Sequence, residues 1–221
     1  GQGPLRMRIE RAQFIYEDDR ILVADKPAGL PVIAPDGSKS HSLLDQATYQ
    51  VQRRNPKGRA AVVHRLDRDT SGIVVFARNA RVKIELMGSW NETVQTRRYV
   101  AVTEACPNDD SGVLEDWLSE ISPGRMSVSS KGDRHALVAI TRYQVLQKGS
   151  RFSLVQLELE TGRKHQIRVQ LAHIGCPIAG DERYGSTQNP LGRLCLHASL
   201  LELRMPDGSL QSFESPVHLR L

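Results

Sequence analysis

Two patterns of hydrophobic residues along this chain predict two kinds of strand. Short runs of consecutive apolar residues at 21–24 and within 72–78 are typical of strands that are buried on both faces. Within 154–159 apolar and polar residues alternate, as they do in a strand with one exposed face. The segments expected to form further strands are 98–103, 138–146, 152–160 and 194–203. The C-terminal half is therefore predicted to be rich in strands.

Two other segments have apolar residues at helical spacing. Ser40 precedes the first of them, which predicts a helix that ends near Asn55 with basic residues in its last turn. A second helix is expected to begin at Thr161, whose hydroxyl can cap it, and to end at Gly175. No repeat or low-complexity linker divides the chain. We therefore expect one α+β domain with a mixed sheet, in which two lobes can share that sheet.

The length and composition exclude several classes of protein. A chain of 221 residues can bury a core without disulfides or metal, and no apolar run approaches the roughly 20 residues of a membrane-spanning helix. Cys106, Cys176 and Cys195 lie far apart without C-x-x-C spacing, which argues against a disulfide framework and a zinc site. These features favour a cytoplasmic protein that binds neither a membrane nor a metal.

Basic residues are concentrated in two parts of the chain. Lysine and arginine number 30 against 25 acidic residues, which gives a net charge of +5. One cluster lies between Arg53 and Arg68, and the other between Arg163 and Arg168. Such clusters indicate a polyanionic partner, although a basic face that only aids solubility is about as common.

The segment 64–72 places charged and hydroxyl-bearing side chains directly before a buried strand. It contains two carboxylates, Asp67 and Asp69, together with three cations and two hydroxyls. A polar loop at the edge of a sheet can face a cleft while the strand behind it holds the backbone. A surface turn with local ion pairs would have the same composition.

A second segment, 161–168, favours a functional role for these charges. On a helix Lys164 and Arg168 share a face, and so do His165 and Arg168. These groups would project near a helix N-terminus, which itself favours anions. The segment is therefore a candidate to hold a phosphate or a catalytic carboxylate.

The sequence HRLDRDTSGIVVFARN at 64–79 closely resembles the central motif of the RluA-type pseudouridine synthases. Three more segments are similar to motifs of that family in the same order, namely DKPAGLPV at 25–32, RRYVAV at 97–102 and TGRKHQIRVQLAHIGCPIAGDERYG at 161–185. The resemblance extends from about Phe14 to Pro216. It implies a pseudouridine-synthase-like α+β domain with a mixed, largely antiparallel central sheet, flanking helices and a basic active-site cleft.

The resemblance also implies an activity and its catalytic residues. The reaction cleaves the bond from C1′ to N1 of a uridine in RNA, turns the base and joins C1′ to C5. Asp67 matches the catalytic aspartate of the family, Tyr99 the active-site tyrosine, and Arg168 the arginine that pairs with that aspartate. A guanidinium would keep the carboxylate ionised in a cleft, while the tyrosine could stack on uracil and assist loss of the C5 proton. Whether the carboxylate attacks the sugar or removes a proton from it stays open.

Other residues of the matched motifs are expected to contact RNA or to orient the reactive loop. Arg65 is notable because a planar cation beside Asp67 can occupy the space that a flipped base leaves. His165 could equally be an ordinary helix histidine. The residues expected to bind RNA are His64, Arg65, Arg68, Arg163, Lys164, His165 and Gln166.

The extent of the resemblance predicts the domain organisation. One catalytic domain is expected over 14–221, behind an N-terminal tail at 1–13 whose residues before Met7 look like a cloning remnant. Many relatives carry an N-terminal RNA-binding module of the S4 type, for which this tail is too short. We therefore expect a monomer that recognises ribosomal or transfer RNA through its catalytic domain, without cofactor or metal. Arg97, where the family more often has lysine, and Leu137, where a basic residue is expected, depart from the family pattern.

Other functions fit the sequence less well. A protein kinase would have the order H-R-D-L with a Gly-rich loop, and a serine hydrolase would have G-x-S-x-G around Ser71; neither is present. A catalytically silent RNA-binding module would be expected to lack Asp67, Tyr99 or Arg168. An RNA-acting glycosidase stays open, because it needs two carboxylates and Asp69 is close to Asp67 in sequence.

Overall fold

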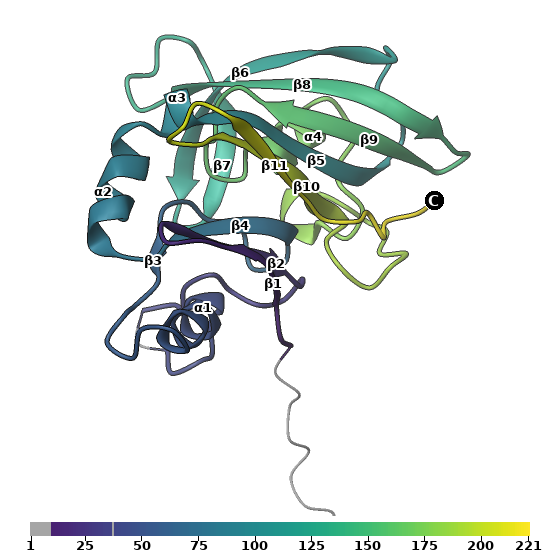
Figure 1. Ribbon diagram of the computed structural model, residues 1–221. Helices are drawn as coiled ribbons and strands as arrows, with labels where there is room; N and C mark the ends of the chain where they lie inside the picture. The colour runs from purple at the N-terminus through teal and green to yellow at the C-terminus, as the bar shows by residue number, and fades with distance from the viewer. Residues whose placement is uncertain (1–9, 37) are drawn as a thin grey trace, which may run out of the picture. The chain divides into compact units, whose positions relative to one another are not determined.

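The computed structural model describes residues 10–36 and 38–221 and divides the chain into two compact units (Figure 1). The first unit ends at Ser89, and the second runs from Trp90 to Leu221. The expected cloning remnant and most of the expected tail lie outside the described residues. Each unit contains helices as well as strands, and the strand pairings described within each unit are antiparallel. The predicted α+β class is therefore confirmed.

The first unit is built around one fully buried strand, β4. All seven residues of β4 are buried, as expected for an aliphatic run that is covered on both faces. Strand β2 pairs along one edge of β4, the short strand β3 pairs along the other, and β1 pairs with β2. The elements of this unit are β1 (Gln13–Glu17), β2 (Ile21–Lys26), α1 (Leu43–Gln52), β3 (Ala61–Val62), β4 (Ser71–Ala77) and α2 (Ala80–Gly88).

Helix α1 starts close to the predicted position and ends earlier than predicted. Ser42, rather than Ser40, caps it: the Ser42 hydroxyl accepts from the Asp45 N–H, and the Asp45 carboxylate accepts from the Ser42 N–H. At the other end Arg53 N–H donates to the Gln50 carbonyl, a bond that tightens the last turn. The basic residues therefore follow the helix, and the expectation that they form its last turn is wrong.

A buried ammonium joins two loops of the first unit. Lys26, at the end of β2, is 1% exposed, and its Nζ donates to the carbonyls of Pro27 at 3.0 Å, Leu30 at 2.8 Å and Arg68 at 2.7 Å. The Gly29 N–H also donates to the Arg68 carbonyl. Because a buried ammonium needs several acceptors to offset its desolvation, these bonds fix the backbone of both loops.

The second unit is a larger antiparallel sheet in the strand order β7-β6-β8-β9-β5-β10-β11. Strands β5, β8, β9 and β10 confirm the four segments predicted in this half, whereas β6, β7, β11 and the short helices were not predicted. All three cysteines are unpaired, as expected. The elements of this unit are α3 (Trp90–Thr93), β5 (Val94–Glu104), β6 (Ser111–Ser122), β7 (Arg125–Ser129), β8 (Leu137–Lys148), β9 (Phe152–Leu159), α4 (Gln166–His173), the 3₁₀ turn η1 (Glu182–Tyr184), β10 (Leu196–Arg204) and β11 (Leu210–Glu214).

Helix α4 begins later than predicted, and Thr161 does not cap it. The cap position is held by His165 in a left-handed conformation, with φ of 54° and no side-chain cap bond. The Thr161 hydroxyl instead accepts from the Ile140 N–H and donates to the Gln166 side chain. Lys164 consequently lies in the turn before the helix, so the prediction that it shares a helix face with Arg168 is wrong. Among the helices of residues 10–36 and 38–221, none is long and apolar enough to cross a lipid bilayer.

The buried side-chain amide of Gln170 attaches α4 to the sheet. Gln170 is fully buried, and its Nε2 donates to the Leu114 and Ala139 carbonyls and to the Asp116 carboxylate, while its Oε1 accepts from the Thr141 hydroxyl. Apolar residues of the same helix pack into the core of the unit beside these bonds. The register of α4 is thus set by directional bonds as well as by apolar packing.

We expect Gln170→Leu to lower the free energy of unfolding by about 2 kcal/mol, because the Thr141 hydroxyl and two main-chain carbonyls would lose a buried partner. Urea unfolding followed by circular dichroism measures the change. Gln147→Leu, at an exposed position of β8, is the control and should stay within about 0.5 kcal/mol of wild type. Equal stability of the two variants would contradict a structural role for the amide.

Lys26→Met should lower the free energy of unfolding by about 3 kcal/mol, because methionine fills the space but cannot donate to the three carbonyls. Amide hydrogen exchange should also become faster in 27–31 and 64–70, since the ammonium joins these segments. Lys39→Met, at an exposed lysine of the same unit, is the matched control. Unchanged exchange in both segments would show that the ammonium does not hold the loops.

Candidate active-site residues

The loop from His64 to Thr70 connects β3 to β4, and its first side chain is anchored to β4. The His64 Nε2 accepts from the Val75 N–H at 2.9 Å. Strand β3 ends at Val62, so the imidazole supplies the acceptor that a longer β3 would have offered through its main chain. This bond requires an unprotonated Nε2. His64, which was expected to bind RNA, therefore positions the loop in this structure.

Asp67 lies in a backbone segment that is held on both sides. Its carbonyl accepts from the Thr70 N–H at 3.1 Å, and the next carbonyl, of Arg68, is held by Lys26 and Gly29. Thr70 is 2% exposed, and the chain then enters the buried strand β4. The Asp67 side chain is half-buried. The sequence thus produces a carboxylate on a short loop with a fixed backbone, which is the arrangement that a catalytic carboxylate requires.

The other charged residues of this loop lie at the surface. Arg65 is exposed, and Arg68 forms a bidentate pair with Asp69, from Nε at 3.1 Å and from Nη2 at 3.2 Å. The side chains of Arg68 and Asp69 are 67% and 47% exposed. Both oxygens of Asp69 are therefore engaged by a neighbouring cation, whereas the Arg65 side chain is accessible from solvent.

In the second unit Tyr99 lies in the middle of the sheet. It belongs to β5, opposite Leu157 on β9 and Ala198 on β10, and its ring is partly buried against the core of the unit. Two residues earlier in the strand, Arg97 extends over the turn that precedes α4: a side chain at Gly162 would lie 2.5 Å from the Arg97 Nη1. The strand therefore holds Tyr99 rigidly, and Arg97 connects it to the 161–168 segment.

Arg168 is fixed by an acidic and an aromatic partner that the sequence analysis did not identify. Its Nε and Nη2 donate to the two oxygens of Asp181 at 2.9 and 2.8 Å, and the guanidinium lies 5.2 Å from the centre of the Tyr184 ring. The Arg168 and Asp181 side chains are only 12% and 1% exposed. Burial raises the pKa of the Tyr184 hydroxyl, so it stays protonated at neutral pH. Asp181 and Tyr184 lie within the motif matched at 161–185, but nothing in that sequence showed that they would face Arg168.

The same tyrosine also fixes the turn before α4. The Tyr184 hydroxyl accepts from the Met126 N–H at 3.0 Å and shares a hydrogen bond of 2.5 Å with the His165 Nδ1. The two rings meet edge to face, with their centres 5.5 Å apart. Tyr184 thus holds His165 in its left-handed conformation while it covers Arg168.

The remaining residues expected to bind RNA differ in their surroundings. Lys164 is exposed, 3.3 Å from the Glu120 carboxylate, and Arg163 donates to the Val138 carbonyl. Gln166 is 3% exposed. Its Oε1 accepts from the Thr161 hydroxyl and the Arg163 N–H, and its Nε2 donates to the Ile140 carbonyl and the Thr141 hydroxyl. This placement favours a structural role for Gln166 over direct contact with RNA.

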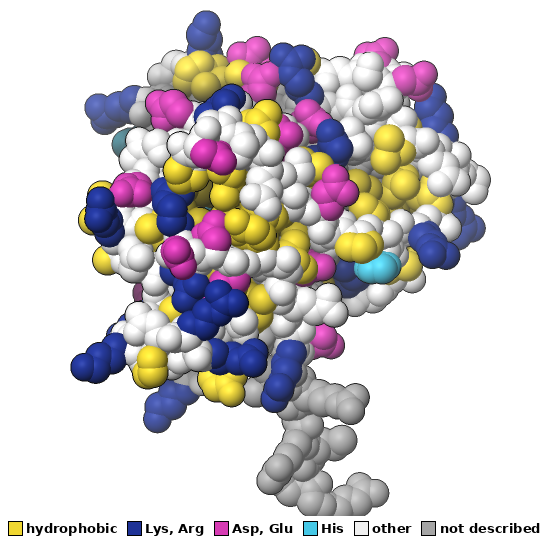
Figure 2. Space-filling view, in the orientation of Figure 1, with side chains coloured by type: hydrophobic (Ala, Val, Ile, Leu, Met, Phe, Trp, Pro, Cys, Tyr) yellow, Lys and Arg dark blue, Asp and Glu magenta, His cyan; other side chains and the backbone are white. Residues whose placement is uncertain are grey.

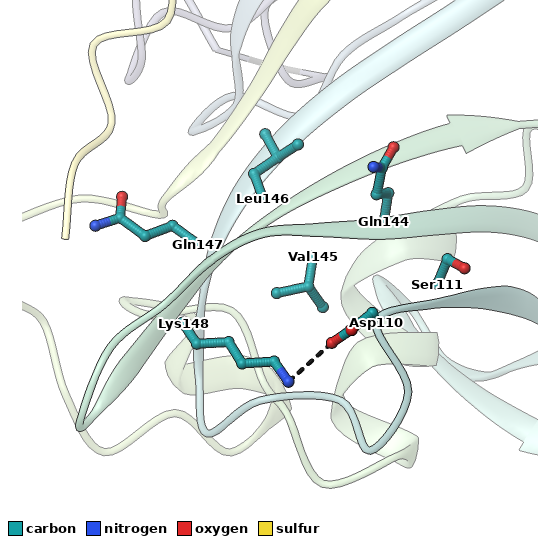
Figure 3. A pocket seen from close by; sticks show the side chains of 7 residues that line it. All are labelled: Asp110, Ser111, Gln144, Val145, Leu146, Gln147 and Lys148. Carbon is teal, nitrogen blue, oxygen red and sulfur yellow. Dashed lines mark ion pairs between the residues drawn. The ribbon is translucent and has the colours of Figure 1, made fainter.

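The three predicted catalytic residues are divided between the units, with Asp67 in the first and Tyr99 and Arg168 in the second. None of them lines the hollow shown in Figure 3, which lies along the last residues of β8 and beside the start of β6. Lys148 and Asp110 form an ion pair of 2.8 Å there (Figure 3). That hollow contains none of the residues predicted to act in catalysis or RNA binding, so it is not a candidate active site.

Comparison with known proteins assigns the chain to a family. A family model described as RNA pseudouridylate synthase matches residues 20–173. The ribosomal large subunit pseudouridine synthase D of Nitrosomonas europaea is 36% identical over 217 residues, which cover 93% of this chain and 62% of that protein. The chain thus spans less than two thirds of the length of that relative. An uncharacterised RNA pseudouridine synthase of Zymomonas mobilis is 34% identical, with 96% of each chain covered.

Solved structures show the same fold. The human RNA pseudouridylate synthase domain containing 4 is 26% identical, with a TM-score of 0.76 over 92% of this chain and 88% of that one. The human RNA pseudouridylate synthase domain containing 1 has a TM-score of 0.73 at 24% identity and covers 94% of this chain and 84% of that one. The resemblance to the RluA-type enzymes is therefore confirmed, and this chain belongs to the RNA pseudouridylate synthase family, a family of isomerases.

Proposed function

We propose that this protein is an RNA pseudouridine synthase that isomerises a uridine of ribosomal or transfer RNA, with Asp67 as its catalytic carboxylate. The observation that carries the proposal is the placement of Asp67 on a loop whose backbone is fixed by Lys26, within the region that matches the family. The names of the relatives from Nitrosomonas europaea and Pseudomonas aeruginosa favour large-subunit ribosomal RNA as the substrate. We expect the enzyme to act in the cytoplasm as a monomer.

In the proposed reaction the bond from C1′ to N1 breaks, the uracil turns, and C1′ bonds to C5. The hydrogen of C5 leaves as a proton, and N1 gains a proton, so the product is an isomer of the substrate. Asp67 acts either as the nucleophile at C1′ or as the base that removes a proton from the sugar. Both routes require an ionised carboxylate.

We propose that Arg168 pairs with the Asp67 carboxylate during the reaction. A guanidinium has five donors, and the bidentate pair with Asp181 uses two of them, so Arg168 can be held in place and still serve a second carboxylate. The Tyr184 ring excludes water from one face of the guanidinium, which strengthens its interactions. Tyr99 is proposed to stack on the uracil and to assist removal of the C5 proton.

The placement of Asp69 argues against an RNA-acting glycosidase. Such an enzyme needs two carboxylates on either side of the scissile bond, one of them as a general acid. Both oxygens of Asp69 accept from Arg68 in an exposed pair, so neither is free to donate a proton to a leaving group in this geometry. The single remaining carboxylate of the loop fits isomerisation better than hydrolysis.

We expect the protein to release tritium from RNA that contains 5-tritiated uridine, and Asp67→Asn to abolish this release, because C5 loses its hydrogen only when the new carbon bond forms. Total ribosomal and transfer RNA are the two substrates. Asp69→Asn is the matched control in the same loop and should retain release within about threefold, since its partner Arg68 is exposed.

Nucleoside analysis of the same reactions distinguishes the alternatives. Pseudouridine is the expected product. Free uracil with abasic sites would establish the glycosidase instead. An absence of release from RNA that the wild type binds would indicate a catalytically silent binding module.

Asp181→Asn should lower kcat at least tenfold, which corresponds to a rise of about 1.4 kcal/mol in the activation free energy, while KM changes little. The reason is that Arg168, without its partner, would no longer be held in position to pair with Asp67. A fall in kcat without a rise in KM, in a variant whose circular dichroism spectrum is unchanged, is the result that a purely structural defect would not produce. Asp207→Asn, in the exposed β10–β11 turn, is the control. An unchanged kcat in a folded Asp181→Asn variant would remove Asp181 from the mechanism.

A further inference from the structure

The turn that follows α1 carries a cluster of cations outside all four matched motifs. Arg53, Arg54, Lys57 and Arg59 lie within seven residues, all of them exposed. No ion pair in the described part of the chain involves these four side chains, whereas other exposed cations, such as Arg81 and Arg142, pair with a carboxylate. We call these four residues the basic turn.

The backbone of the basic turn is well determined by hydrogen bonds. The Asn55 N–H donates to the Val51 carbonyl, the Gly58 N–H donates to the Asn55 carbonyl at 2.8 Å, and the Gln52 side chain donates to the Gly58 carbonyl at 3.2 Å. Gly58 packs so closely that a Cβ would lie 2.9 Å from the Val51 Cγ1. The four charges are therefore carried by an ordered turn, which reduces the entropy lost when they bind a ligand.

An exposed aromatic ring lies on α1 next to this turn. The Tyr49 side chain is 72% exposed, and it precedes Arg53 by four residues, so both project from the outer face of the helix. Aromatic rings beside cations are typical of surfaces that bind unpaired nucleotides, because any base can stack on the ring while the cations hold the backbone. The pairing of Tyr49 with the basic turn is thus a feature that simple solubility does not explain.

A hollow lies where the helix meets the basic turn. It has a volume of about 240 Å³ and is lined by Glu17, Gln50, Arg53 and Arg54. The Glu17 carboxylate is already engaged, with Arg78 at 3.3 Å and the Gln50 side chain at 3.2 Å, so it does not neutralise the two arginines of the lining. In the space-filling view dark-blue side chains gather around α1 (Figure 2). An anionic group of the size of a phosphate fits this hollow.

We propose that Tyr49 and the basic turn form a docking surface for the phosphodiester backbone of single-stranded or looped RNA, with one base stacked on Tyr49. Three of the four cations are arginines, which bind phosphate oxygens in a bidentate manner. Arg59 precedes Asp67 by eight residues, so the two Cα atoms are less than about 30 Å apart. One RNA can therefore reach both, and this surface would hold nucleotides that flank the target uridine. The identity of the RNA rests on the proposed function, whereas the binding of phosphates by the cations and of a base by Tyr49 does not.

Binding to RNA tests the proposal without catalysis. We would measure the Kd of the Asp67→Asn protein for fluorescently labelled large-subunit ribosomal RNA fragments and transfer RNA, between 0.05 and about 0.3 M salt. Adding Arg53→Gln, Arg54→Gln and Lys57→Gln should weaken binding at least tenfold at about 0.1 M salt. It should also reduce the slope of log Kd against log salt by about 2, since each phosphate contact with a single strand contributes about 0.7.

A matched triple variant controls for net charge. Arg81→Gln, Arg142→Gln and Lys148→Gln remove the same number of charges from exposed side chains that pair with carboxylates on the protein. This variant should retain the salt slope and change Kd less than threefold. Tyr49→Ser should weaken binding about fivefold to tenfold without a change in slope, whereas Tyr49→Phe keeps the ring and should retain the affinity.

The outcomes separate this proposal from its alternatives. Equal weakening by the two triple variants, or no weakening by the basic-turn variant, would overturn it. Binding to vesicles that contain anionic lipid, lost in the basic-turn variant while RNA binding persists, would assign the surface to a membrane instead. RNA binding that depends on the basic turn, without tritium release by the wild type, would uphold the docking surface and reject the proposed activity. Tritium release by the wild type, with RNA binding that does not depend on the basic turn, would uphold the activity and reject the docking surface.

Discussion

The first unit depends on the way a buried positive charge is compensated. The Lys26 ammonium has almost no contact with solvent, and a charge in that position is stable only when acceptors replace the lost water. Three main-chain carbonyls accept from it, of which two belong to the loop after β2 and one belongs to Arg68. Because carbonyls are fixed parts of the chain, their bonds to the ammonium determine the path of both loops. The backbone beside Asp67 is thereby set before any substrate binds.

In the second unit a poorly solvated positive charge is compensated by a carboxylate instead of carbonyls. Asp181 is buried and the Arg168 side chain is only 12% exposed, so removal of either partner would leave a poorly solvated charge uncompensated. Tyr184 covers the guanidinium and bonds to His165, so the cation, its partner and the turn before α4 form one packed group. The buried amides of Gln166 and Gln170 hold the same helix against β8. Arg168 is therefore positioned by several directional bonds, as a residue that must present its charge in one orientation requires.

The sequence predicted the parts of this structure that local patterns control. The aliphatic runs of β2 and β4 indicated buried strands because burial on both faces leaves no place for polar residues. The start of α4 was missed because the Thr161 hydroxyl bonds across to Ile140, a contact that local spacing cannot show. Asp181 and Tyr184 were missed for the same reason, since their roles arise only when the chain turns back and α4 packs beside them. The assignment of Asp67 came from the motif around it, and its position on a fixed loop agrees with that assignment.

Residues of the matched motifs do not share a single role. His64 and Gln166 use their polar atoms inside the protein, whereas Arg65 and Lys164 present theirs to solvent. A motif therefore identifies a reactive segment as a whole. It does not distinguish the side chains that position this segment from the side chains that are available to contact RNA. The basic turn shows the converse, because its cations lie outside the motifs and four of them in seven residues remain without a carboxylate partner in the described part of the chain. Such like charges repel one another in the free protein, and a bound polyanion would relieve that repulsion. Exposed cations without a carboxylate partner are thus a better guide to where RNA binds than the cations within the motifs.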